Sequence, residues 1–122
     1  MTTPHRVHSL TEARAVLAAT AGAVTLESPA AAAGYQGIGW WRALVAALAD
    51  EFSDREIVAV LDCGTAPGHA LEALRAGVKA VRLDAPAETL AAVKEIAAAL
   101  GGEVSQKKPS FRQEENPEGG AG

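Results

Sequence analysis

The sequence predicts an α/β fold in which an open, mostly parallel sheet is flanked by helices. Short apolar runs rich in Val, Ile and Leu alternate along the chain with segments of helical periodicity, as in proteins built from strand–helix units. Two of these runs end alike, because residues 24–29 (VTLESP) and 81–86 (VRLDAP) both place a carboxylate after a leucine. The length of 122 residues fits one domain, so we expect four strand–helix units in a single sheet with right-handed crossovers.

The first unit is predicted from a capping signal. A short strand at residues 6–8 precedes Ser9, an expected N-cap, and Glu12 occupies the third helical position of a capping box. The helix that follows is expected to end at Gly22. The second strand then covers residues 23–26.

The second unit contains the longest predicted loop, at residues 28–39, which holds Pro29 and the glycines Gly34, Gly37 and Gly39. A helix is expected to begin near Trp40. Its predicted buried face follows the helical period and consists of Trp41, Leu44, Val45, Leu48 and Phe52.

The third and fourth units are predicted from residue 57 onward. The apolar run 57–61 is typical of a strand buried on both faces of a parallel sheet. Thr65, as N-cap, and Pro67 open a helix that ends at Gly77. A strand at 78–83, a helix from Pro86 to Leu100 and a marginal fifth strand at 103–106 complete the series.

The domain layout follows from composition. Residues 1–5 form a flexible N-terminus and residues 6–106 the single α/β domain. Residues 107–122 are rich in Lys, Pro, Gln, Glu and Gly, so we expect this tail to be disordered and dispensable.

Charge and cysteine content limit the possible partners. The formal net charge of −4 argues against binding to nucleic acid, which requires a basic surface. Cys63 is the only cysteine, which excludes an internal disulfide and suits a reducing compartment. No secretory signal is evident, and the apolar stretch 40–49 is too short to cross a bilayer. We therefore expect a cytoplasmic protein with no membrane contact.

The ends of the predicted strands carry the candidate ligand-binding residues. Ligands of parallel sheets bind beyond the carboxyl ends of the strands. The polar residues expected there are His8, Glu27, Asp62, Cys63 and Asp84. The competing interpretation is that Glu27, Asp62 and Asp84 cap the helices that follow them.

Two glycine-containing loops are candidate anion sites, because backbone amides at a helix start can hold an anion. Their residues are Gly37, Gly39, Gly64 and Thr65. Neither loop has the spacing of a P-loop or of a dinucleotide-binding fingerprint, and simple flexible connections are the competing interpretation.

Other single residues have two interpretations each. Cys63 is either a nucleophile near a helix start or a small buried apolar residue. Trp40 and Trp41 are adjacent, so both cannot face the core, and Trp40 is the candidate contact with a loop or a partner chain. The histidines show no metal-ligand spacing and there is no CxxC pair, so we expect no metal and no cofactor.

From about residue 7 to residue 100 the sequence resembles a response-regulator receiver domain that lacks its first strand and helix. Residues 9–13 with 24–27, residues 36–44, and residues 57–86 carry this likeness. The resemblance places Glu27 at the phosphoacceptor position, Asp62 at a hydroxyl position and Ala85 at a lysine position. It thus implies a degenerate, non-catalytic member that takes no phosphate.

The same stretches are also similar to strand–helix units of phosphate-binding barrels, in which an ALRAGV sequence before a strand is common. Four such units make half a barrel. We expect a non-enzymatic receiver-like or half-barrel module that acts through protein–protein contacts, as a homodimer. The alternative is a small-molecule or phosphometabolite-binding protein, and conceivably an enzyme, with its site at the strand ends.

Overall fold

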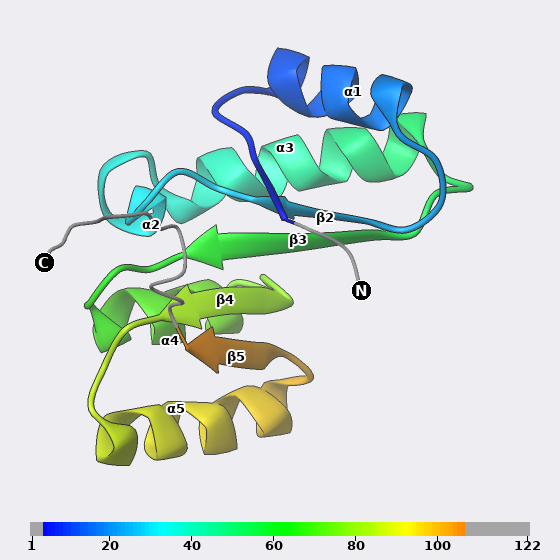
Figure 1. Cartoon of the computed structure of the whole chain (residues 1–122). Helices are drawn as coiled ribbons and strands as arrows, with labels where there is room; N and C mark the ends of the chain where they lie inside the picture. Colours follow the sequence, from blue (N-terminus) through cyan, green and yellow to red (C-terminus); the bar gives the residue numbers. More distant parts are fainter. Residues whose placement is uncertain (1–3, 107–122) are drawn as a thin grey trace, which may run out of the picture.

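The computed structural model describes residues 4–106 and shows strands and helices in alternation (Figure 1). The predicted disorder of residues 107–122 lies outside the described residues. In chain order the elements are β1 (His5–Arg6), α1 (Leu10–Ala19), β2 (Val24–Glu27), α2 (Ala32–Tyr35), α3 (Ile38–Glu51), β3 (Ile57–Asp62), α4 (Pro67–Arg75), β4 (Ala80–Leu83), α5 (Ala87–Leu100) and β5 (Glu103–Gln106).

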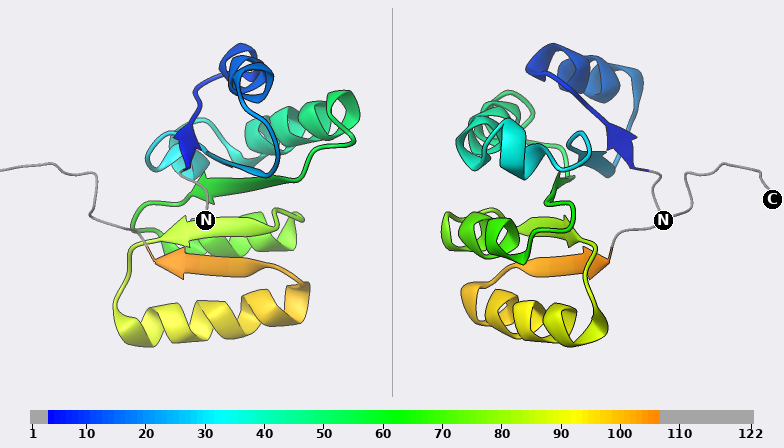
Figure 2. Two further views of the ribbon diagram at one scale, coloured as in Figure 1. Left: turned by 45° about the vertical axis from the view of Figure 1, so that its right-hand side comes forward. Right: turned by 90° about the vertical axis from the view of Figure 1, so that its left-hand side faces the viewer.

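The strands form one five-stranded sheet in the order β1-β2-β3-β4-β5, and every neighbouring pair is parallel. The predicted α/β class is therefore confirmed, and the marginal fifth strand is present. Because right-handed crossovers between successive strands place every helix on the same side, this order produces a one-sided sheet. The right-hand view of Figure 2 shows the helices wrapping one side of the strands, with no helix of the described residues over the other side.

Burial along the strands matches this one-sided arrangement. Leu26, Leu61 and Val81 are fully buried and belong to the core under the helices. Their neighbours alternate to the opposite side, where Val58 is 41% exposed. We call this opposite side the open face; by alternation it carries Arg6, Thr25, Glu27, Val58, Val60, Asp62, Ala80, Arg82, Glu103 and Ser105.

The prediction that residues 57–61 are buried on both faces holds only at the carboxyl end of the strand, where Leu61 on the helix side and Val60 on the open face are both buried. Ile57 and Ala59, on the helix side, are themselves only partly buried, and Val58 is exposed on the open face. A run of apolar residues is compatible with burial on one face or two, and here the topology leaves one face uncovered.

The first strand–helix unit has the predicted N-cap at Ser9, but the bounds of its strand differ from the prediction. The Ser9 Oγ accepts a hydrogen bond from the Glu12 N–H at 3.1 Å. The Glu12 carboxylate accepts the His8 N–H at 2.7 Å, one residue earlier than in a standard capping box. The strand is His5–Arg6 rather than residues 6–8, and the Val7 N–H beyond it still donates to the Glu27 carbonyl at 2.9 Å.

Two helix boundaries also differ from the prediction. The loop 28–39 contains the short helix α2, whose N-cap Ala31 adopts a left-handed conformation with φ of 56°. Helix α3 begins at Ile38, so Gly39 lies inside it. The N-cap of α4 is Ala66 without a side-chain bond, so the prediction that Thr65 caps this helix is wrong.

Helix α3 buries the predicted face. Trp41, Leu44 and Leu48 are buried, while Val45 and Phe52 pack against the core with partial exposure. Helix α5 buries Leu90, Val93 and Ala97, at helical spacing along one face. The helices thereby form one continuous core with the inner side of the sheet.

Candidate functional site

Four charged residues meet on the open face near the carboxyl ends of the strands. We call Arg6, Glu27, Asp62 and Arg82 the strand-end cluster. Arg6 is opposite Glu27 in the register, and Asp62 is opposite Arg82, so the four come from four consecutive strands. Glu27 and Asp62 were expected at this edge, and the sheet brings them to one place.

Glu27 is the most tightly held member of the cluster. Its carboxylate is 2.8 Å from the Arg82 Nε and 3.1 Å from the Arg82 Nη2, a bidentate pair. The Arg6 Nη2 donates to the same carboxylate at 3.2 Å. The side chain of Glu27 is buried and forms charged hydrogen bonds across the sheet, so it does not cap the following helix.

Asp62 connects two loops at the same edge. Its Oδ1 accepts the N–H of Ala31 at 3.0 Å and the N–H of Gly64 at 2.8 Å. Its Oδ2 is 3.9 Å from the Arg6 Nη2. These amides belong to the loops after β2 and β3. The Asp62 carboxylate therefore joins the two loops at the carboxyl end of the sheet and does not cap a helix.

Cys63 is buried directly after Asp62. Burial first, and the neighbouring Asp62 charge second, raise the pKa of this thiol to about 12. The thiol is therefore protonated at neutral pH. A cysteine nucleophile requires the opposite shift, toward a stable thiolate.

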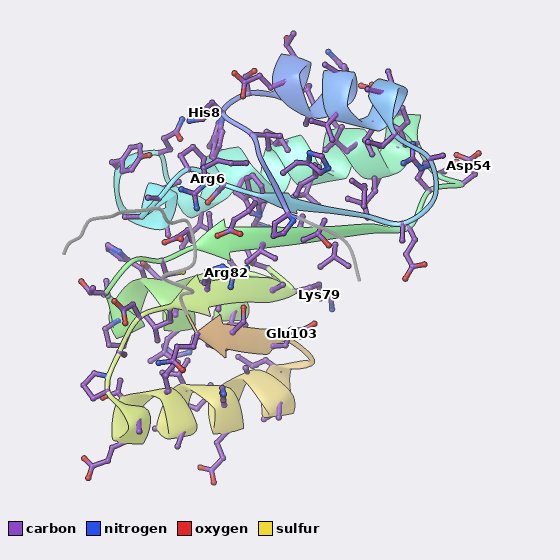
Figure 3. The ribbon with its side chains drawn as sticks, in the orientation of Figure 1. Arg6, His8, Asp54, Lys79, Arg82 and Glu103 are labelled. Atoms are coloured by element: carbon purple, nitrogen blue, oxygen red, sulfur yellow. The ribbon has the colours of Figure 1, made fainter. Side chains whose placement is uncertain are left out.

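The structure does not bring His8 or Asp84 into the cluster. His8 lies at the start of α1, apart from Arg82 on β4 (Figure 3), and its ring contacts Glu12 at 3.2 Å. The His8 backbone and ring hydrogen bonds lower the pKa of Glu12. Asp84 is exposed, and only its backbone N–H is bound, to the Gly64 carbonyl, within the described residues. The N-cap of α5 is Pro86, so Asp84 is not a cap either.

The glycine candidates lie in two separate places. Gly37 is the N-cap of α3 with φ of 95°, whereas Gly39 is helical. Gly64 has φ of 60°, and a Cβ there would lie 3.0 Å from the Ala31 Cβ. This close approach of two loops accounts for glycine at position 64. Thr65 is exposed, and an anion-binding role for these residues stays a prediction.

The sequence reasoning missed Arg6 and Arg82, the cationic half of the cluster. Arg82 is only 8% exposed although it lies within an apolar strand. A charged residue in a buried strand requires a partner of opposite charge, and this was the available signal. Glu27, the other buried charge at a strand end, is the partner it finds.

In the described residues, no group of three or more His, Cys, Asp or Glu side chains is arranged to hold a metal ion. Within residues 4–106 no helix has both the length and the apolar character needed to cross a membrane. No protein-family model matches the chain, and no curated protein is significantly similar to it.

Proposed function

We propose that this protein is a non-enzymatic, half-barrel interaction module that pairs its open face with a second copy of itself. The observation that carries this proposal is an all-parallel sheet with helices on one side only. Parallel sheets are normally covered on both faces. On this face Val58 is 41% exposed, and a second copy would cover it.

The strand order supports the half-barrel over the receiver-like architecture. Doubly wound folds reverse their strand order at a switch point and carry helices on both faces. Here the order is sequential, and the helices share one side. Successive barrel units have this arrangement.

A second copy suits the open face because one interface covers the face and both edges. A two-fold axis parallel to the strands would place β1 of one chain beside β5 of the other, both running in the same direction. These are the edge strands of the sheet, and edges left unpaired invite association. The open face carries two arginines against Glu27, Asp62 and Glu103, so its charge of −1 opposes pairing only weakly.

Light scattering after size exclusion, at tens of micromolar protein, tests the proposal. We expect a mass near twice the 12.5 kDa of one chain. Val58→Lys, on the open face, is expected to give a monomer with an unchanged circular dichroism spectrum. Ile96→Lys is the matched control, because Ile96 is 36% exposed on α5. A monomeric wild-type chain would overturn the proposal.

Trp40 provides the contrasting variant. It is half-buried on α3, packs against the core and lies 5.6 Å from Trp41 between ring centroids. Its role in an interface stays a prediction, and it concerns the helix side. A dimer broken by Trp40→Glu but not by Val58→Lys would place the interface on the helices and refute open-face pairing.

The strand-end cluster favours a second candidate function, the binding of a small anionic metabolite. The Arg6 side chain is 35% exposed at the edge where ligands of parallel sheets bind. A thermal-shift screen with phosphorylated and carboxylated metabolites tests this function, since a specific ligand stabilises the fold. A stabilising ligand whose effect persists in Arg6→Gln would place its site elsewhere.

A further inference from the structure

A hollow of about 250 Å³ lies on the helix side of the sheet, away from the strand-end cluster. Its walls come from α3, from the amino half of β3, and from the turn between α4 and β4. A second hollow of about 160 Å³ shares Val45, Ala49, Ile57 and Ala59 with it. Small side chains leave this space open, because Ala46, Ala49 and Ala59 line it where larger residues would fill it.

The buried wall of the hollow contains an unsatisfied hydrogen-bond donor. Trp41 is 1% exposed and lines the space, and within the described residues its Nε1 has no hydrogen-bond partner. A buried N–H without a partner is costly, so native structures usually supply an acceptor. Solvent does not reach the Nε1 itself, so this indole N–H is a reporter on the wall of the hollow and not a donor to a ligand.

The rim of the hollow is cationic. Arg42 extends from α3 and Lys79 from the turn before β4, and no acidic residue lines the space. Figure 3 shows Lys79 at the amino end of β4. Among residues 4–106, neither cation forms an ion pair with a carboxylate. Glu103 is the nearest acid in the register, and its N–H binds the Lys79 carbonyl.

We propose that this hollow binds a small carboxylate with an apolar body, for which a monocyclic aromatic carboxylate is the best match. The body lies against Val45, Ile57 and Val78, and the carboxylate lies between Arg42 and Lys79. An apolar cavity of about 150 Å³ holds benzene, so about 250 Å³ accommodates a ring with a short acidic substituent. The apolar walls and few polar groups are typical of small-molecule sites.

Titration with benzoate and phenylacetate, followed by ¹⁵N NMR, tests this proposal. The Trp41 indole N–H resonance, identified with a Trp40→Phe variant, is expected to shift on addition of either probe. Benzylamine, of similar shape and opposite charge, is expected to leave it in place. An unmoved resonance at 20-fold molar excess and millimolar concentration (about 10 mM, well above the weak affinity of a fragment) would overturn the proposal.

Two variants locate the site. Arg42→Gln with Lys79→Gln is expected to weaken benzoate binding at least about 10-fold, since both cations are lost. Lys94→Gln, which removes an exposed cation on α5 outside the hollow, is the control and is expected to leave benzoate binding unchanged. Ala46→Leu is expected to fill the hollow and abolish binding while the spectrum stays that of a folded protein. Binding unchanged in both the double variant and Ala46→Leu would refute the site. None of these outcomes depends on dimer formation through the open face.

Discussion

Glu27 and Glu51 are carboxylates with the same bidentate arginine geometry and different surroundings. Glu27 is buried with Arg82, whereas the contacts of 2.8 and 2.5 Å between Arg14 and Glu51 lie at the surface. Removing one partner of a buried pair leaves an uncompensated charge. Glu27→Gln is therefore expected to lower the free energy of unfolding by about 3–5 kcal/mol.

Glu51→Gln is the matched control, and we expect little measurable change because solvent and salt screen exposed pairs. Urea unfolding of both variants measures the difference. Equal losses in the two variants would contradict a structural role for the strand-end cluster.

The Cys63 thiol is expected to make stability depend on alkaline pH. Burial raises its folded pKa to about 12 from the ordinary value of 9.0. The unfolded chain therefore loses the thiol proton first, so stability falls between about pH 9 and pH 12 and is unaffected by this group below pH 9. At pH 10 the loss is on the order of 1 kcal/mol.

Cys63→Ala is expected to lack this loss. The comparison is between urea-unfolding free energies of wild type and variant at pH 8 and pH 10. If the difference between the two proteins is the same at both pH values, Cys63 does not have the raised pKa that its burial implies.

At the scale of secondary-structure elements, replacing two glycines by alanine is expected to have opposite effects on stability. Gly39 is helical and has open space around its Cβ position, so Gly39→Ala is expected to stabilise the protein by about 0.5–1 kcal/mol. A Cβ at Gly102 would lie 2.8 Å from Leu74 Cδ2 and 3.2 Å from the Lys79 carbonyl. Gly102→Ala is expected to destabilise by about 1–3 kcal/mol.

Melting temperatures of the two glycine variants, measured side by side, check this contrast. Destabilisation by Gly39→Ala would show that position 39 requires more than helical geometry. The predicted anion-binding role of its loop would then merit a direct test.

Most elements were predictable because helical period and strand composition are local properties of the sequence. The end of α5 at Gly101, in a left-handed conformation, is one such local signal. Which side of the sheet stays open is not determined by a local property of the sequence. Residues 57–61 are apolar whether one face or two are covered, and only the strand order decides between these cases.

The strand-end cluster was predictable in part for the same reason. Carboxylates that follow a predicted strand can be recognised as site candidates from the sequence alone. Arg82, in contrast, lies within a strand, and its partner Glu27 is 55 residues away. The pairing requires the register of three strands, since β3 separates β2 from β4. The position of His8 was missed because its backbone and ring bind Glu12 at the start of α1, a contact that the predicted strand at residues 6–8 did not include.

At the scale of the whole molecule, dimer formation predicts that stability depends on concentration. A dimer that unfolds to separate chains gains stability by mass action. We expect the melting temperature to rise between about 1 and 100 µM protein, and to stay constant for Val58→Lys, whose open face is disrupted. A wild-type melting temperature independent of concentration would argue for a monomer.

The tail provides a second test at this scale. Ending the chain after Gln106 removes residues 107–122, and we expect the melting temperature to change by no more than about 2 °C, as for a neutral surface change. A larger fall, together with a monomeric full-length chain, would identify the tail as the cover of the open face in place of a second copy.

The sequential strand order also affects how the domain opens. Each strand pairs only with units that adjoin it in the sequence, so β1 and β5, at the two ends of the described chain, are also the two edges of the sheet. Opening can therefore begin at either end and remove one strand–helix unit at a time, while β2, β3 and β4 remain paired. Local opening of this kind proceeds through contiguous units of structure. The strand-end cluster opposes it, because Arg6 and Arg82, from the outer pairs, are both bound to the carboxylate of Glu27.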